Sequence, residues 1–255
     1  MTFLTKKDNL LNMKNEILKF IGVGSAFNTG FGNTSAFFMC GETMILFDCG
    51  ESVFGRIQGS ELMDGVKSLK VFITHNHPDH VGSLGSLIFF CYFCKKIPVE
   101  VYGDQDLYSI LKMTGVKDEQ FSFKNISENF PKTFSFTPLI GNLEYKITPV
   151  VTKHADNLFC VGYHVKETNS EVSFYYSGDS SEIPSSVLNA FLHGHITCLY
   201  EDTSWLDYEG NVHLSYKKLC SIIDTRRDSV YIMHTDNNFN LEKAVHDGFK
   251  IAGKN

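Results

Sequence analysis

The stretch THNHPDH, residues 74–80, places three histidines and one aspartate within six positions, with a proline among them. Imidazole and carboxylate together suit zinc, with manganese or iron as second choices. His75 and His77 are two residues apart, so an extended turn points both side chains the same way. After the proline, Asp79 and His80 begin the next helix and face a neighbouring point. We therefore expect one metal ion at His75 and His77, and a second at Asp79 and His80.

Three more candidate ligands are distant in the chain: His154, Asp179 and His234. Each follows a run of strand composition, and these runs are 143–153, 171–177 and 229–233. Loops at the carboxyl ends of strands converge on one edge of a sheet, where ligand sites form. We expect His154 to complete the first metal site, His234 to complete the second, and Asp179 to bridge them. Two metal ions about 3.5–4 Å apart can hold a hydroxide between them and stabilise the attacking and leaving oxygens.

The elements that must position these ligands are short β-rich runs interleaved with helical ones, without an internal repeat or a low-complexity linker. Layered sheets covered by helices explain such an order, so we expect a single domain over 1–255 with residues 1–15 as a loose N-terminal arm. The expected strands are 17–24, 35–40, 43–48, 69–74, 99–103, 143–154, 159–167, 171–178, 197–203 and 229–234. The expected helices are 81–96, directly after His80, and 104–114, 184–194, 213–224 and 241–252. The stretch 117–138 is expected to be less regular.

Composition narrows the class of protein. The chain has 255 residues, 43% of them hydrophobic, and a formal net charge of −6. It lacks a Lys/Arg stripe, which disfavours stable nucleic-acid binding, although a metal can supply the local charge that a small anion needs. The apolar run 84–94 is too short for a membrane span. Seven widely spread cysteines and no evident secretory signal predict reduced thiols and a cytoplasmic location.

The pattern HxHxDH with His154, Asp179 within YYSGDSS, and His234 resembles the metallo-β-lactamase superfamily over about 18–234. The resemblance implies an α/β fold, the four-layer αββα metallo-β-lactamase sandwich. It also implies that Asp79 both binds the second metal and orients the attacking hydroxide. The run ILFDCGE looks like an early aspartate motif of the superfamily, which places Asp48 beneath the metal site.

Within the superfamily, DCGE, SGDS and EDTSWLDYEGNVHLSYKKL resemble the ribonuclease Z group. The resemblance implies that Glu201 orients His213 and that His213 protonates the leaving oxygen of a phosphoester. Histidine suits this role near neutral pH. The chain has Glu-Asp-Thr at 201–203 where the group usually has Glu-Ala-Thr.

Transfer-RNA 3′-processing enzymes of this group carry a long arm between the positions that match His154 and Asp179. Only 24 residues separate the two here, and two strands and a turn use them. Length, the missing arm and the opening GVGSAFNTGFGNTS are similar to the anti-Pycsar proteins of phages and bacteria. That resemblance implies a homodimeric phosphodiesterase that hydrolyses 3′,5′-cyclic nucleotides and silences a host defence signal, in the host cytoplasm if the gene is a phage's.

The expected cofactors are two divalent ions, Zn²⁺ first and Mn²⁺ second. For the nucleobase, Phe27 or Phe31 could provide stacking, although core packing is the favoured interpretation of either residue alone. Trp205 lies between Glu201 and His213 in the sequence and is a candidate for the pocket wall or a dimer contact.

Three alternatives stay open. A tRNA 3′-end endonuclease would cleave precursor tRNA with steep salt dependence and ignore cyclic nucleotides. A lactonase or thioesterase of another superfamily branch would be indifferent to the loss of His213. A non-catalytic metalloprotein would retain a nucleotide without turnover.

Overall fold

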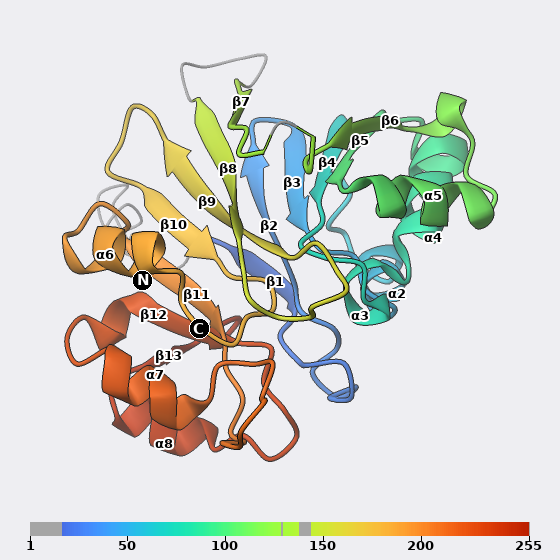
Figure 1. Ribbon diagram of the computed structural model, residues 1–255. Helices are drawn as coiled ribbons and strands as arrows, with labels where there is room; N and C mark the ends of the chain where they lie inside the picture. The colour runs from blue at the N-terminus through green and yellow to red at the C-terminus, as the bar shows by residue number, and fades with distance from the viewer. Residues whose placement is uncertain (1–16, 129, 138–143, 255) are drawn as a thin grey trace, which may run out of the picture.

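The computed structural model describes residues 17–128, 130–137 and 144–254. The expected N-terminal arm, 1–15, lies outside the described residues. Two sheets face each other at the centre of the molecule, and helices cover the outer face of each (Figure 1). The expected αββα architecture is confirmed.

The first sheet has six strands in the order β1-β2-β3-β4-β5-β6, antiparallel from β1 to β3 and parallel from β3 to β6. Its strands are β1 (Lys19–Gly22), β2 (Ser35–Cys40), β3 (Thr43–Phe47), β4 (Ser68–Phe72), β5 (Val99–Gly103) and β6 (Ser122–Asn125).

The second sheet has seven strands in the order β13-β12-β11-β10-β9-β8-β7. It is parallel from β13 to β10 and antiparallel from β10 to β7. Its strands are β7 (Phe134–Phe136), β8 (Tyr145–Val151), β9 (Val161–Glu167), β10 (Ser173–Tyr176), β11 (Cys198–Asp202), β12 (Val230–Met233) and β13 (Lys250–Ile251).

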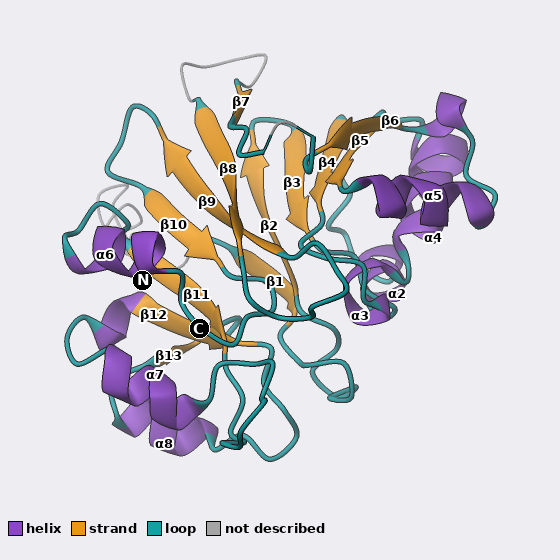
Figure 2. Ribbon diagram, in the orientation of Figure 1, coloured by secondary structure: helices purple, strands orange, loops and turns teal. Residues whose placement is uncertain are grey.

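The helices form two groups, one on each outer face (Figure 2). The first sheet is covered by α2 (Val53–Gln58), α3 (Pro78–Val81), α4 (Leu84–Phe90) with its π-helical extension η1 (Cys91–Lys95), and α5 (Gln105–Met113). The second sheet is covered by α6 (Ser185–Leu192), α7 (Tyr216–Ile222) and α8 (Leu241–His246). Two short 3₁₀ turns are η2 (Asp118–Gln120) and η3 (Arg227–Ser229).

Aromatic side chains fill the space between the sheets. Phe47, Phe72 and Tyr163 are fully buried there, and the rings of Phe72 and Tyr102 stack with centroids 4.2 Å apart. Large flat rings bury much apolar area each and hold the sheets at a fixed spacing. The strand ends that carry the candidate ligands are therefore rigid relative to one another.

Three expectations about elements need correction. The stretch 117–138 contains β6 and β7, because both pair as sheet-edge strands despite weak alternation. The closing helix expected over 241–252 ends at His246; Gly248, at φ +96°, reverses the chain, and residues 250–251 pair as β13. The helix expected from 213 begins at Tyr216, because Ser215 caps it by accepting from Lys218 N.

Within the described ranges, no helix is both long and apolar enough to cross a membrane.

Candidate metal centre

The turn after β4 is shaped by its own residues. Pro78 occupies the first turn of α3, with His77 in extended conformation just before it. Asn76 Nδ2 donates to Asp104 Oδ1 at 2.8 Å, and the same oxygen caps α5 by accepting from Leu107 N. The turn is thus tied to the start of a neighbouring helix.

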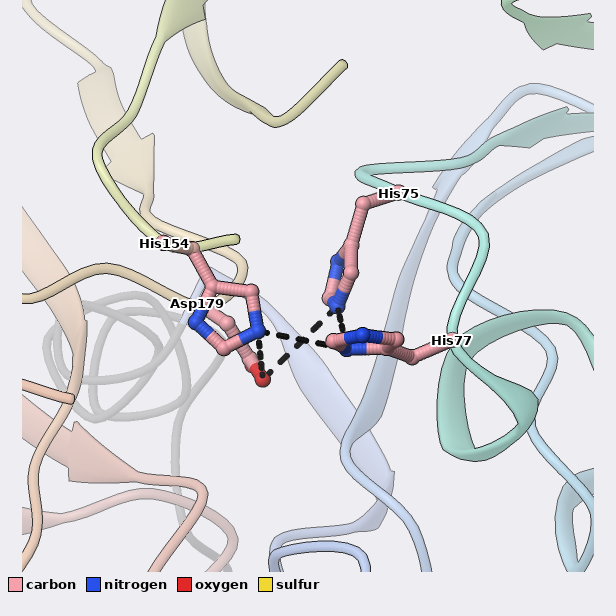
Figure 3. Close-up of side chains that lie close together, drawn as sticks. All are labelled: His75, His77, His154 and Asp179. Carbon is pink, nitrogen blue, oxygen red and sulfur yellow. Dashed lines mark hydrogen bonds and ion pairs between the residues drawn. The ribbon is translucent and has the colours of Figure 1, made fainter. Parts of the chain in front are cut away.

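The first donor set joins His75 and His77 with two residues of the second sheet, His154 and Asp179 (Figure 3). His77 Nδ1 lies 3.0 Å from His75 Nε2 and 3.2 Å from His154 Nε2. Asp179 Oδ2 lies 3.8 Å from His75 Nε2 and 3.6 Å from His154 Nε2. Four ligand atoms from three separate loops therefore point at one spot.

The second donor set consists of Asp79, His80, Asp179 and His234, all buried. Asp179 Oδ1 lies 3.1 Å from His80 Nε2 and 3.3 Å from His234 Nε2. Asp79 Oδ2 lies 3.3 Å from His234 Nε2 and 3.4 Å from His80 Nε2. Asp179 thus turns one oxygen toward each set, as a bridging carboxylate does.

These donors fit divalent metal ions. Within each set the ligand atoms lie within 4.8 Å of one another, and nitrogen and oxygen are the ligands of zinc and manganese sites. His80 Nε2 and Asp179 Oδ1 are buried without a hydrogen-bond partner. Buried polar atoms are seldom left unpaired, and an ion at this spot would satisfy both.

Outer partners hold the imidazoles in place. Asp48 accepts from His80 Nδ1 at 2.9 Å, from Thr74 N at 2.8 Å and from Tyr176 Oη at 3.1 Å. Asp48 adopts φ +60°, a strained value for a residue with a side chain, and these hydrogen bonds offset that strain. His154 Nδ1 donates to Val212 O at 3.0 Å. Such contacts fix which ring nitrogen faces a metal. Asp48 thus lies on the Nδ1 side of His80, next to the second donor set.

The charges of the two sets differ. Burial works against a charged imidazole at His80, yet Asp179 and Asp48 raise its pKa well above the ordinary value. Burial likewise opposes the raised pKa of His234, about 10, which Asp179 and Asp202 bring about. At His75, burial and the neighbouring His80 lower the pKa well below the ordinary value. Without metal, the second set holds protons that a metal ion must displace.

His213 lies beside both sets, and its carboxylate partner is not the one expected. Its Nδ1 donates to Asp202 Oδ2 at 2.6 Å. Glu201, the expected partner, points to the other face of β11, where its Oε1 is buried and unpaired. Side chains alternate along a strand, so Asp202 faces the site and Glu201 faces the helices. The prediction that Glu201 orients His213 is wrong.

Asp202 and His213 also form a third group of close ligand atoms with Asp179 and His234. Two nitrogen or oxygen ligands of one tetrahedral zinc lie about 3.3 Å apart. The 2.6 Å contact between His213 Nδ1 and Asp202 Oδ2 is shorter and is that of a hydrogen bond. The two residues therefore form a hydrogen-bonded pair beside the donor sets.

A cavity of about 520 Å³ opens over the donor sets. Phe27, 87% exposed, lies at the edge of this cavity, and its contact with substrate stays a prediction. The other two aromatic candidates lie elsewhere. Phe31 lines a separate cavity of about 250 Å³. Trp205 stacks on Tyr216 with ring centroids 5.1 Å apart and packs into the helix-covered core. The prediction of a pocket contact is wrong for both.

The sequence reasoning missed Asp202 and the pocket wall formed by Leu206, Tyr208 and Val212. The alternation of side chains along a strand could have indicated Asp202. Tyr200, two residues earlier, has the character of a core residue, and residues two apart on a strand lie on the same face. The wall residues lie on an irregular loop, and nothing in their spacing marks them.

Comparison with known proteins agrees with this geometry. The anti-Pycsar protein Apyc1 of Bacillus phage BSP38 is 26% identical over 244 residues, covering 87% of this chain and 89% of that protein. A metallo-β-lactamase fold protein of Bacillus subtilis superposes with a TM-score of 0.68 at 16% identity, covering 92% of this chain and 93% of that one. The short form of human tRNase Z gives 0.64 at 18% identity, covering 86% and 93%.

The fold is therefore that of the metallo-β-lactamase superfamily, and the donor sets support a metal-dependent hydrolase of this type. The model of the family described as "Anti-Pycsar protein Apyc1" matches residues 17–252, and the chain belongs to that family.

Proposed function

We propose that this protein is a phosphodiesterase that hydrolyses 3′,5′-cyclic nucleotides with two divalent metal ions, Zn²⁺ first and Mn²⁺ second. One observation carries the proposal: two donor sets share Asp179, and His213, hydrogen-bonded to the buried Asp202, lines the same cavity as these sets. A phosphodiester needs an activated water, charge neutralisation and a proton for the leaving oxygen.

The residues divide this work. His75, His77, His154 and Asp179 would hold one ion, and Asp79, His80, His234 and Asp179 the other. The ions, when bound, lower the pKa of water and neutralise phosphate charge.

Asp79 orients the attacking oxygen. As that oxygen forms its bond to phosphorus, the bond to the ribose oxygen breaks. His213 Nε2 gives its proton to the ribose oxygen and regains one from water. Burial opposes a charged His213, but Asp202 raises its pKa, which favours the protonated acid at neutral pH.

The cavity supports a small substrate. Its volume of about 520 Å³ lies within the roughly 300–1,000 Å³ range of small-ligand sites. The exposed ring of Phe27 offers a stacking surface for a nucleobase. Membership of the anti-Pycsar family supports a cyclic-nucleotide signal as the substrate, and removal of a host defence signal and a homodimer are part of the proposal.

A tRNA 3′-end endonuclease is the second candidate, because the short human tRNase Z shares the fold. Between His154 and Asp179 the chain forms β9 and β10 with a short turn, so no long arm extends there to hold a tRNA. The net charge of −6 also disfavours binding to a polyanion.

A turnover assay decides between these functions. Zinc-loaded protein is given purine and pyrimidine 3′,5′-cyclic mononucleotides and, separately, a precursor tRNA, each with and without chelator. We expect chelator-sensitive conversion of cyclic nucleotides to monoesters and an intact tRNA. Cleavage of the tRNA with no turnover of any cyclic nucleotide would reverse the assignment.

A further inference from the structure

Asp202 lies at the end of β11 with only 1% of its surface exposed. Its backbone N–H donates to Ser177 Oγ at 2.9 Å, and its Oδ2 accepts from Ser180 N at 3.0 Å. Both partners belong to the loop that follows β10 and carries Asp179. The carboxylate is therefore fixed to the rigid end of the second sheet.

The same carboxylate serves two imidazoles. Oδ2 accepts a hydrogen bond from His213 Nδ1 at 2.6 Å, whereas Oδ1 lies 3.3 Å from His234 Nδ1 in an ion-pair contact that is not aligned as a hydrogen bond. The two rings stack with centroids 5.1 Å apart and an interplanar angle of 27°. Asp202 thus occupies the Nδ1 side of both rings and leaves both Nε2 atoms free for the site.

His213 is one of the less enclosed histidines of the site. It lies on the loop before α7, and its side chain is 26% exposed. Apart from the bond to Asp202, a hydrogen bond from its backbone N–H to Asn211 Oδ1 at 3.0 Å holds this position. That bond fixes the backbone and leaves the ring free to rotate. Among the described residues, Asp202 is the hydrogen-bond partner of this ring, which also packs beside the rings of His154 and His234.

We propose that Asp202 is a positioning residue that aligns His213 as the proton donor to the leaving oxygen and, with its other oxygen, holds His234 as a metal ligand. One carboxylate then orients both the proton donor and one ligand of the second donor set. This inference rests on the proposed function. It assigns to Asp202 the role that the resemblance gave to Glu201 and extends it to a metal ligand.

Leaving-group dependence separates positioning of an acid from a structural role. A ribose oxygen leaves poorly without a proton, whereas p-nitrophenolate leaves readily without one. The substrates are a 3′,5′-cyclic nucleotide that the wild-type protein hydrolyses and bis(p-nitrophenyl) phosphate. The variants are Asp202→Asn, which keeps the shape of the side chain, Asp202→Ala, His213→Ala and the double variant His213→Ala/Asp202→Asn. Asp224→Asn, an exposed aspartate after α7, is the matched control.

We expect Asp202→Asn to lower kcat on the cyclic nucleotide about 100-fold and turnover of the nitrophenyl ester less than about 10-fold. The double variant should be no slower on the cyclic nucleotide than His213→Ala alone, because the two residues act as a unit. Zinc affinity, measured on metal-free protein by competition with a chromophoric chelator, should weaken about 10-fold in Asp202→Asn and stay unchanged in His213→Ala.

Equal losses on both substrates, or additive losses in the double variant, would overturn the positioning role. Unchanged zinc affinity in both Asp202 variants would overturn the link to His234. If the wild-type protein turns over no cyclic nucleotide but does hydrolyse bis(p-nitrophenyl) phosphate, the substrate assignment fails. In that case the zinc affinities of the Asp202 variants still show whether Asp202 supports His234 as a metal ligand.

Discussion

The two sheets contribute to the site in different ways. The first sheet supplies four donors from a single turn after β4, and that turn is tied to α5 through Asn76 and Asp104. The second sheet supplies its groups one at a time, from the ends of different strands and the loop before α7. These groups are His154, Asp179, Asp202, His213 and His234.

The difference separates metal binding from chemistry. Each of the four donors on the turn belongs to one donor set only: His75 and His77 to the first, Asp79 and His80 to the second. The second sheet completes both sets through Asp179, and it alone provides the His213–Asp202 pair. Changes at the three histidines of the turn should therefore act through metal affinity, whereas changes at His213 or Asp202 in the second sheet can alter chemistry with metal still bound.

The largest effect is expected for Asp179→Ala, which removes one donor from each set. Both zinc affinities and cyclic-nucleotide turnover should fall by more than the roughly 100-fold that loss of an outer partner costs. Asp79→Ala, on the turn, is the comparison: it removes a donor from the second set only. Isothermal titration of metal-free protein should show one tight zinc site in Asp79→Ala and none in Asp179→Ala. Two tight sites in Asp179→Ala would remove the bridging role.

His213→Ala tests the other side of the comparison. General acid catalysis contributes roughly 10²–10⁴-fold, so turnover of the cyclic nucleotide should fall by about that factor. Bound zinc, measured by atomic emission after gel filtration, should stay at the wild-type level. Turnover by His213→Ala at the wild-type rate would instead favour a lactonase or thioesterase, which does not need this residue.

A smaller effect is expected for Asn76→Ala, which cuts the tie between the turn and α5. Zinc affinity should weaken about 10-fold, because His75 and His77 lose their fixed orientation. Asp104→Ser is a matched control, since serine preserves the helix cap and is too short to reach Asn76 well. Both variants should lose metal affinity alike while helix content, followed by circular dichroism, stays unchanged. Loss confined to Asp104→Ser would mean that the Asp104 carboxylate acts other than through Asn76, and unchanged zinc affinity in both variants would mean that this hydrogen bond does not orient the turn.

The smallest effect on activity is expected for Glu201→Gln, because Glu201 faces away from the donor sets. Burial and the nearby Asp202 raise the pKa of Glu201 well above the ordinary value. An acid with a raised pKa in the folded state stabilises the protein fully at low pH and less as pH rises. The Gln variant cannot ionise. Its free energy of unfolding relative to wild type should therefore rise from about pH 4.3 upward, by at most about 1.4 kcal/mol per pH unit.

Urea unfolding of metal-free protein at pH 5, 6 and 7 measures this difference. A difference that does not change with pH would mean that Glu201 ionises freely, contrary to its buried and unpaired position.

The comparison also explains how far the sequence predicts the molecule. The four donors of the turn are contiguous, so residue types and spacing alone indicate them. His154, Asp179 and His234 were predicted from their place after strand-like runs, and the structure brings them together with the turn. Their roles as ligands stay predictions.

Glu201 and Asp202 show where such reasoning ends. The two acids are adjacent, and which one faces the site depends on the parity of β11 relative to the core. Family resemblance favoured the glutamate, whereas the pleat of the strand turns the aspartate inward. Phe31 and Trp205 fail for a related reason: aromatic composition does not distinguish a pocket wall from a core, and loop conformation decides between them.

Zinc reconstitution tests whether two metal ions support hydrolysis of a cyclic nucleotide by this protein. Chelator-treated protein is titrated with Zn²⁺ while hydrolysis of a 3′,5′-cyclic nucleotide is followed against the zinc bound per chain. We predict negligible activity without metal and full activity near two equivalents. Full activity at one equivalent or none, or no turnover of any cyclic mononucleotide at two, would contradict the account.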